Sequence, residues 1–182
     1  MTRLLIPDAG PLFSLAAGNL LGLLSHFRLG ITDVVKEETI DRGLGPKASS
    51  EAQRLLSFYN ANAAEIEIFQ TQVGRDIRAL RATTPNYQAP RNVGELSIQS
   101  LLIDLQLQGV RPPPVILFED GWFLRNAQAL AKPCIAISTQ AFLVNAERMK
   151  LIKSAAKARD AIAACRPDAY DDIKSIDMAP PP

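Results

Sequence analysis

Acidic residues stand at several places in this chain where a strand-like segment ends or a helix-like segment begins. Asp8 follows the apolar run "LLIP", and Glu119 and Asp120 follow "VILF". Glu38 lies within "DVVKEE", and Glu95 lies within "NVGEL". Carboxylates that converge on one cleft repel one another unless a cation lies between them, and carboxylates without paired His or Cys suit Mg²⁺ or Mn²⁺. Such a cation can orient a phosphodiester, activate water and neutralise charge on the leaving oxygen.

Each of these acids also has a purely structural interpretation. Asp8 could cap the helix that follows it, and Glu95 could complete a capping box at the start of its own helix. Glu38 could be an exposed helix residue, and Glu119 with Asp120 could favour the positive end of the next helix dipole. None of the acids is specific alone, so the hypothesis of a metal site depends on their joint order along the chain.

The elements that would position these acids alternate between strand and helix. Short apolar segments predict strands at 3–7, within 28–35, and at 65–69, 115–120 and 133–138. Helical patterns start near residue 11 and cover 33–43, 47–63, 73–82, 92–109, 121–131 and 139–165. Such alternation predicts an α/β fold with a mostly parallel central sheet and helices on both faces. In a parallel sheet, ligands bind beyond the carboxyl ends of the strands, which is where Asp8 and Asp120 would lie.

The chain is expected to form one domain over residues 1–147, followed by a basic amphipathic helix over 148–166 and a flexible tail over 167–182. Lys150, Lys153 and Lys157 fall on one face of that helix. They could form an edge for RNA or for an acidic protein segment, or they could be the solvated face of a helix docked on the domain.

Bulk properties exclude several classes of protein. The formal net charge of +1 gives no whole-molecule bias toward nucleic acid, so a basic surface would have to be local. No apolar run reaches the ~18 residues that a membrane span requires, and Pro7 and Pro11 interrupt the apolar N-terminal segment. Cys134 and Cys165 lack metal-type spacing and are expected to be thiols in a reducing compartment. We therefore expect a cytoplasmic protein with no membrane partner.

The ordered set "LLIPDAGPLFSLA", "ITDVVKEE", "NVGELSIQSLL" and "VILFED", followed by "CIAISTQAFL", resembles the PIN-domain family over residues 3–147. The likeness is greatest to a compact bacterial branch in which a "GE" helix precedes a strand that ends in two acids. The resemblance implies a three-layer α/β/α sandwich that cleaves RNA with Mg²⁺ or Mn²⁺ held by three or four acids. Many bacterial members are VapC-like toxins of toxin–antitoxin pairs.

Carried over to this sequence, the resemblance implies a role for each acid. Asp8 matches the first acid of the family, Glu38 the second, Glu95 the acid of the "GE" helix and Asp120 the final acid. These four are the expected catalytic residues. Asp8, Glu95 and Asp120 would hold the metal, with Glu119 as a neighbouring ligand.

The same resemblance implies RNA as substrate, a possible small antitoxin as partner, and a homodimer. Arg91, Arg125 and Lys132 could contact phosphates, as could the lysines of 148–166. The apolar segment "LLGLL" at 20–24 suggests more apolar surface than one small core can cover, which favours a dimer. At Gly10, many relatives carry a hydroxyl near the metal. The competing hypothesis is a catalytically silent PIN-like scaffold that binds a protein or RNA partner through the basic C-terminal helix.

Overall fold

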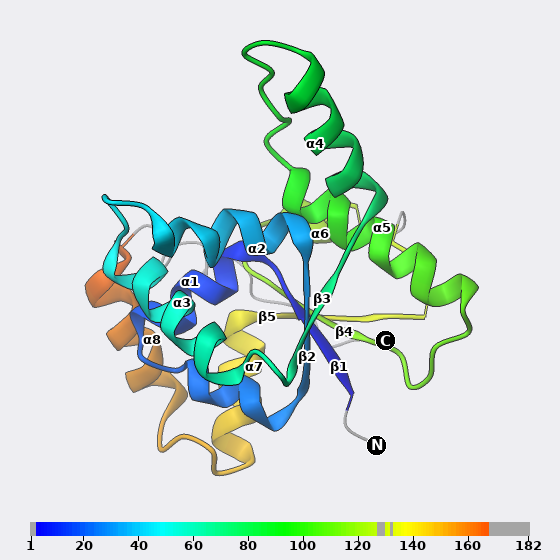
Figure 1. The fold of residues 1–182 in the computed structure, drawn as a ribbon. Helices are drawn as coiled ribbons and strands as arrows, with labels where there is room; N and C mark the ends of the chain where they lie inside the picture. Colours follow the sequence, from blue (N-terminus) through cyan, green and yellow to red (C-terminus); the bar gives the residue numbers. More distant parts are fainter. Residues whose placement is uncertain (1–2, 127–129, 132, 168–182) are drawn as a thin grey trace.

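A computed structural model describes residues 3–126, 130–131 and 133–167, and a five-stranded sheet forms its centre (Figure 1). The strands are β1 (Leu4–Pro7), β2 (Arg28–Thr32), β3 (Ile66–Phe69), β4 (Val115–Phe118) and β5 (Ile135–Ser138). Their order is β3-β2-β1-β4-β5, and every neighbouring pair is parallel. Leu5 pairs with Leu29 of β2 on one side and with Val115 of β4 on the other. The predicted parallel sheet is confirmed, with β1 in the middle.

Helices cover both faces of the sheet, which gives the predicted α/β/α arrangement. On one face, α1 (Ala9–Ala17) packs against α3 (Ser50–Asn62) and α8 (Ala155–Cys165), and α8 packs against α7 (Thr139–Arg148). On the other face lies α5 (Val93–Leu107). Every residue of β1 and β4 is buried, as expected for central strands of a parallel sheet that is covered on both sides.

Two further helices lie beside the carboxyl ends of the strands. α2 (Asp33–Thr39) follows β2 directly, and the 3₁₀ turn η2 (Asp41–Leu44) follows α2. α4 (Gln72–Thr83) projects beyond the sheet as an arm, and its base contacts α2 and α5 (Figure 1). A small apolar cluster separate from the main core fills this junction: Val34, Ile77 and Val93. The arm is therefore joined to the body next to α2.

Most helices begin with a hydroxyl side chain that accepts a backbone N–H. The capping residues are Thr32 for α2, Ser49 for α3, Thr71 for α4, Ser138 for α7 and Ser154 for α8. By contrast, Asp8 precedes α1 and Asn92 precedes α5, and neither side chain makes a capping hydrogen bond. The alternative in which Asp8 and the Asn92–Glu95 pair serve as ordinary helix caps is thus not what the structure contains.

The prediction of one continuous helix over 139–165 was wrong. α7 ends at Arg148, and α8 begins only after Ser154. Lys150 adopts a left-handed backbone conformation with φ of 60°, and the Leu151 N–H donates to the Ala146 carbonyl at 2.9 Å. This geometry closes the end of α7 and reverses the chain. Lys150 and Lys153 therefore lie in a turn, while Lys157 is in the first turn of α8, so the three do not share one helical face.

The segment "LLGLL" does not supply an apolar surface for a dimer. Leu21, Leu23 and Leu24 of the 3₁₀ turn η1 (Leu21–His26) are buried in the main core. This six-residue 3₁₀ turn packs against β2 and α1 and turns these leucines inward, so this argument for self-association was wrong.

The structure also bears on the predictions for the helix over 121–131, the two cysteines and a membrane span. The helix predicted over 121–131 is the short α6 (Trp122–Arg125), while 127–129, Lys132 and 168–182 lie outside the described residues. Cys134 and Cys165 are not joined by a disulfide. Within the described part of the chain, no helix is long and apolar enough to cross a membrane.

Candidate functional site

Three of the predicted acids meet at the first turn of α5. Gly94 has no side chain, and a Cβ at this position would lie 2.9 Å from Glu38 Oε2 and 3.2 Å from Asp8 Oδ1. The carboxylate after β1 and the carboxylate on α2 therefore approach the same point on the α5 backbone. Glu95 is the next residue along α5 and is itself buried. In the "GE" pair, Glu95 therefore supplies one carboxylate, and the missing side chain of Gly94 leaves room for the carboxylates of Asp8 and Glu38.

Asp120 joins this group from the end of β4 and also has a structural role. Its Oδ1 accepts the Trp122 backbone N–H at 2.8 Å, at the start of α6. Its side chain also lies close enough to the carboxyl group of Glu95 to raise the pKa of that group. The alternative interpretation of Asp120, as a residue that stabilises the next helix, is therefore correct without excluding its place in the acidic group.

Glu119 is buried against α1 on the other side of Asp8. A Cβ on Gly10 would lie only 3.0 Å from Glu119 Oε2, so the missing side chain at position 10 makes room for this carboxylate. Arg166 Nη1 lies 3.7 Å from Glu119 Oε2 and donates to the Gly10 carbonyl at 3.0 Å and to Ser14 Oγ at 2.7 Å. An arginine that follows α8 therefore lies beside this acid, a contact that the sequence did not suggest.

Burial and mutual repulsion make the acids hard to ionise. Burial, together with the nearby charges of Asp120, Glu38 and Glu119, raises the pKa of Asp8 to about 7, while the Ala9 backbone N–H opposes the shift. Burial likewise raises the pKa of Glu95 to about 8, with the charge of Asp8 as the next cause. Carboxylates in this state gain from a bound proton or from a bound cation. We define Asp8, Glu38, Glu95, Glu119 and Asp120 as the acidic cluster.

The residues of the cluster fit a hard divalent cation by their chemistry. All donors are carboxylate oxygens, and their charges repel, which is the donor set that Mg²⁺ and Mn²⁺ prefer. Across the described residues, however, no three His, Cys, Asp or Glu side chains already stand close enough to form a ready-made metal site. Binding a cation would therefore require the side chains to draw together around it.

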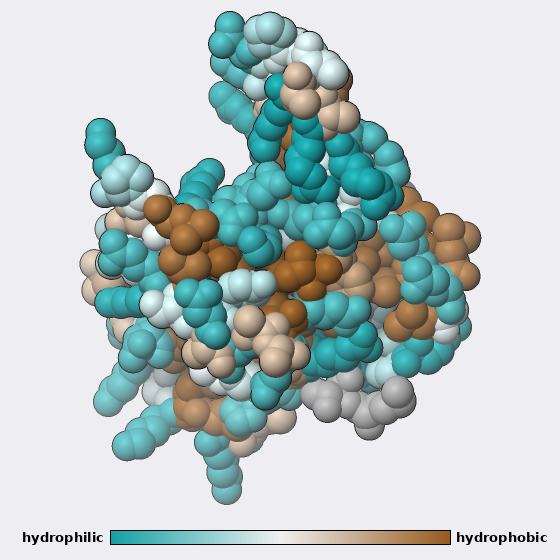
Figure 2. All heavy atoms as spheres, viewed as in Figure 1, coloured by the Kyte–Doolittle hydropathy of each residue, from teal (hydrophilic) through white to brown (hydrophobic). Residues whose placement is uncertain are grey.

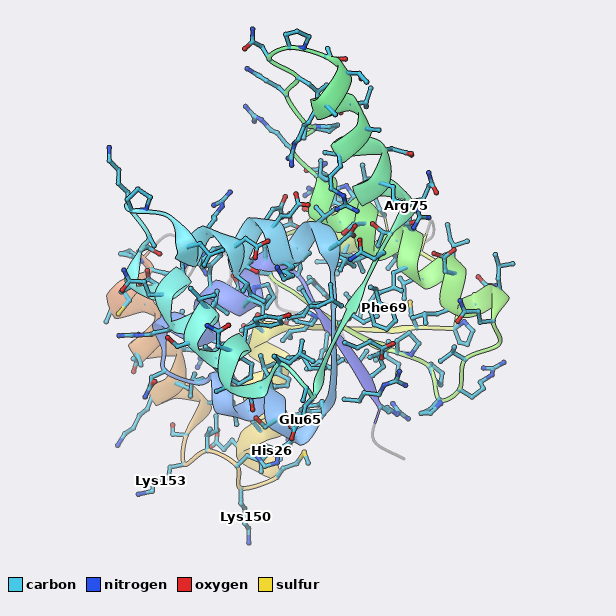
Figure 3. The ribbon with its side chains drawn as sticks, in the orientation of Figure 1. His26, Glu65, Phe69, Arg75, Lys150 and Lys153 are labelled. Carbon is cyan, nitrogen blue, oxygen red and sulfur yellow. The ribbon has the colours of Figure 1, made fainter. Side chains whose placement is uncertain are left out.

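The predicted RNA-binding residues divide into two groups. Arg91 is exposed in the loop that leads to α5, four residues before Glu95, and Arg125 is exposed at the end of α6, five residues after Asp120. Lys150 and Lys153 are labelled in Figure 3 beside His26 and Glu65, near the starts of β2 and β3. Those two lysines therefore lie toward the amino ends of the strands, away from the acidic cluster.

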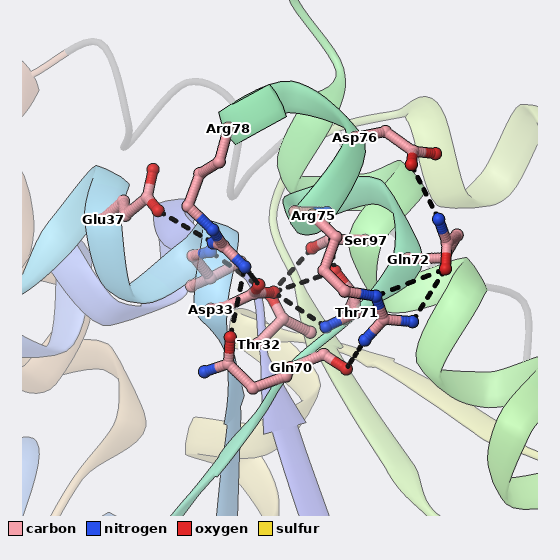
Figure 4. A network of polar contacts seen from close by, with 12 residues as sticks. Thr32, Asp33, Glu37, Gln70, Thr71, Gln72, Arg75, Asp76, Arg78 and Ser97 are labelled. Atoms are coloured by element: carbon pink, nitrogen blue, oxygen red, sulfur yellow. Dashed lines mark hydrogen bonds and ion pairs between the residues drawn. The ribbon is translucent and has the colours of Figure 1, made fainter. Parts of the chain in front are cut away.

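A second buried aspartate, which sequence reasoning did not single out, follows β2. Asp33 Oδ1 accepts the Thr71 N–H at 3.1 Å and the Thr71 hydroxyl at 2.8 Å (Figure 4). Its Oδ2 pairs with Arg78 Nη2 at 2.7 Å, and Arg78 also donates to Glu37 Oε1 at 3.0 Å. This network, defined as the Asp33 network, ties α2 to the base of the α4 arm.

A cavity of about 290 Å³ lies between α2, α4 and the start of α5, and Glu38 of the acidic cluster is one of its walls. Arg42 and Arg81 are also at its edge. Both arginines act against the burial and the Glu37 charge that raise the pKa of Glu38. The apolar lining consists of Val34, Ile77, Ala89 and Val93. The sequence does contain a signal for this arginine-rich side of α4, because "RDIRALRA" has an arginine at every third position.

Comparison with known proteins does not assign the chain to a family. No family model, no curated protein and no solved structure matches the chain.

Proposed function

We propose that this protein is a Mg²⁺- or Mn²⁺-dependent endoribonuclease of the PIN type. The observation that carries the proposal is the approach of Asp8 and Glu38 to Gly94, directly beside Glu95. A buried group of like charges is costly, so a fold that keeps several of them at the carboxyl edge of a parallel sheet is suited to a cation there. The ordered motifs that resemble the PIN family support the same function.

Asp8, Glu95 and Asp120 would hold the cation, with Glu119 beside Asp8. When bound, the cation would supply charge neutralisation at the phosphodiester and make water a better nucleophile. Glu38 opens to the neighbouring cavity, and its raised pKa suits it to accept a proton from the attacking water. Arg91 and Arg125 would contact phosphates of the strand on either side.

A cleavage assay tests this function directly. Labelled single-stranded RNA is incubated with the purified protein in Mn²⁺, in Mg²⁺ and in EDTA. We expect internal cleavage that needs the metal and that Glu95→Gln abolishes. Asp76→Asn, which changes an exposed acid on α4, is the matched control and should cleave as the wild type does. Equal cleavage by Glu95→Gln and the wild type would overturn the proposal.

A second candidate is the catalytically silent scaffold, and two observations favour it. Asp120 already accepts a hydrogen bond from the start of α6, and Gly10 stands where members of the PIN family often carry a hydroxyl. A silent scaffold would bind its RNA or protein partner equally well with and without divalent cations. Titration calorimetry with Mn²⁺ separates the two candidates. If the protein is the nuclease, Mn²⁺ binding should produce heat and displace protons in the wild type, and both signals should be lost in Asp8→Asn.

The proposal extends to the cellular role that the resemblance implies: the toxin of a toxin–antitoxin pair, cytoplasmic and dimeric. A small reading frame that overlaps upstream and encodes a binding protein would support the toxin role. Light scattering at micromolar concentration tests the homodimer, and a monomeric mass would count against it.

A further inference from the structure

The cavity beside the acidic cluster has three kinds of wall. Its floor is apolar, formed by the cluster of Val34, Ile77 and Val93. Its edge carries two exposed arginines, Arg42 and Arg81. Glu37 and Glu38 of α2 supply carboxylate oxygens on a third side. We call this cavity the arginine pocket.

We propose that the arginine pocket binds one nucleotide of a single-stranded RNA, next to the phosphodiester at the acidic cluster. This inference rests on the proposed function, since Glu38 belongs to both the pocket and the cluster. The cavity of about 290 Å³ is close to the lower end of small-molecule sites, about 300 Å³, and so suits a single base rather than a longer segment.

The chemistry of each wall matches one part of a nucleotide. An apolar floor accepts the faces of a base ring, and arginine guanidinium groups bind phosphate oxygens in a two-pronged geometry. Carboxylates accept hydrogen bonds from base N–H groups, such as the amino groups of guanine, adenine and cytosine. A molecule of this mixed character is a nucleotide in a strand rather than a free anion or an apolar ligand.

The arginines differ in how far the protein already uses them. Arg78 pairs with Asp33 and Glu37, so it belongs to the Asp33 network. Arg81 Nη1 pairs with Glu37 Oε2 at 3.0 Å, yet the Arg81 side chain is half exposed, and a guanidinium has five N–H donors. Arg42 is exposed on η2. Arg42 and Arg81 therefore retain donors for a phosphate, whereas Arg78 is committed to the fold.

The test measures RNA binding without cleavage. Fluorescence anisotropy with a labelled single-stranded RNA of about ten nucleotides in EDTA compares the wild type with Arg42→Gln/Arg81→Gln. We expect at least a tenfold weaker affinity and a shallower salt dependence, because two phosphate contacts are lost. The charge-matched control is Lys150→Gln/Lys153→Gln, whose affinity should stay within twofold, since these lysines lie toward the other edge of the sheet.

A second variant guards against a folding defect. Ala89→Trp adds a ring at the wall of the pocket without changing charge, and it should weaken RNA binding by a similar factor while the melting temperature is retained. Wild-type affinity in both the double variant and Ala89→Trp would overturn the inference, as would a wild-type protein that binds no RNA. Loss of affinity in the lysine pair equal to that in the arginine pair would also overturn it.

The same experiment separates this inference from the proposed function. A protein that binds RNA through Arg42 and Arg81 but cleaves nothing in Mn²⁺ would refute the nuclease and leave the pocket standing. If the protein cleaves RNA in Mn²⁺, but neither RNA affinity nor cleavage changes in the two pocket variants, the pocket is refuted and the nuclease is supported.

Discussion

Asp8 and Asp33 follow neighbouring parallel strands and are buried to a similar extent, 7% and 4% exposed, yet their surroundings are opposite. Asp33 receives two hydrogen bonds from Thr71 and an ion pair from Arg78. Asp8 makes no capping bond and faces other acids, which raise its pKa together with burial. The fold therefore treats the same residue type, at equivalent strand ends, in two ways.

The difference separates a structural acid from a candidate functional one. A buried carboxylate with matched donors contributes to the stability of the contact that it makes, and removing it leaves its partners unsatisfied. A buried carboxylate among other acids costs stability and keeps its oxygens available to a cation. Burial alone would not have distinguished them, whereas the sign of the surrounding charge does.

The largest expected effect is on catalysis. Asp8→Asn should lower the rate of metal-dependent RNA cleavage by about a thousandfold, equivalent to about 4 kcal/mol in the barrier, because it removes an anionic ligand. Asp33→Asn should cleave within about tenfold of the wild type under conditions where it is folded. Single-turnover cleavage in Mn²⁺ measures both, and equal losses would break the distinction between the two aspartates.

The next largest effect is on stability and falls on the other aspartate. Asp33→Ala should lower the free energy of unfolding by about 3 kcal/mol, since it leaves Arg78 and two buried donors of Thr71 without their acceptor. Urea denaturation measures this change. Asp76→Ala, on the exposed side of α4, is the control and should stay within about 0.5 kcal/mol of the wild type. A similar small change for Asp33→Ala would contradict the structural role.

The pH dependence of stability should also divide the two aspartates. Asp8 and Glu95 have raised pKa values in the fold, about 7 and 8, so between about pH 4 and pH 8 the folded state binds more protons than the unfolded chain. The free energy of unfolding should therefore fall by several kcal/mol as pH rises through this window, and level off above it. Asp8→Asn should flatten the fall, and so should Mn²⁺, which replaces the protons.

Thermal melting across this pH range provides the measurement. Asp76→Asn should show the wild-type profile, because this exposed acid takes no part in the cluster. A wild-type stability that rises from pH 5 to pH 8 would show that the cluster is not a source of strain.

The smallest expected effect comes from two glycines that each face one aspartate. A Cβ on Gly94 would lie 3.2 Å from Asp8 Oδ1, and a Cβ on Gly74 would lie far too close to the carboxylate of Asp33. Gly94→Ala should lower cleavage about tenfold with stability changed by less than about 1 kcal/mol, since alanine favours a helix and Asp8 can move. Gly74→Ala should instead lower stability, by about 2 kcal/mol, because Asp33 is fixed by its partners.

Cleavage and urea denaturation of the two alanine variants complete the comparison. If Gly94→Ala destabilised the protein as much as Gly74→Ala, the Asp8 carboxylate would be as firmly held as that of Asp33.

The sequence predicted the sheet because its strands are short apolar runs with clear boundaries. The rule that parallel strands end at one edge predicted that Asp8 lies near Glu119 and Asp120, whereas Glu38 and Glu95 were included from the order of the motifs along the chain. It did not distinguish Asp33, because the partners of this residue lie at positions 71 and 78, far along the chain. Their pairing depends on where α4 docks, and no local pattern contains that information.

The predictions for 139–165 and for the leucines at 21–24 were wrong for the same reason: in each case the local sequence does not mark a turn of the backbone. The apolar stripe that joins Leu151 to Ala155, Ala158 and Ile162 is real as a set of buried or half-buried residues, but it crosses a turn. Lys150 takes the left-handed conformation that usually marks glycine, so composition gave no sign of the break. The leucines at 21–24 looked like excess apolar surface because the 3₁₀ turn that buries them has no strong sequence signature.

The central position of β1 has implications for the order in which the chain assembles during synthesis. β1 pairs with β2 early in the sequence, but its other neighbour, β4, begins only at Val115. A nascent chain that has emerged only to residue 114 can form β1, β2 and β3 while Asp8 still has water in place of Glu119 and Asp120. The charges of Glu119 and Asp120 are added to those of Asp8, Glu38 and Glu95 only as the second half of the sheet closes, and Arg166 reaches Glu119 later still. A partly synthesised chain is therefore spared the part of the repulsion that Glu119 and Asp120 contribute.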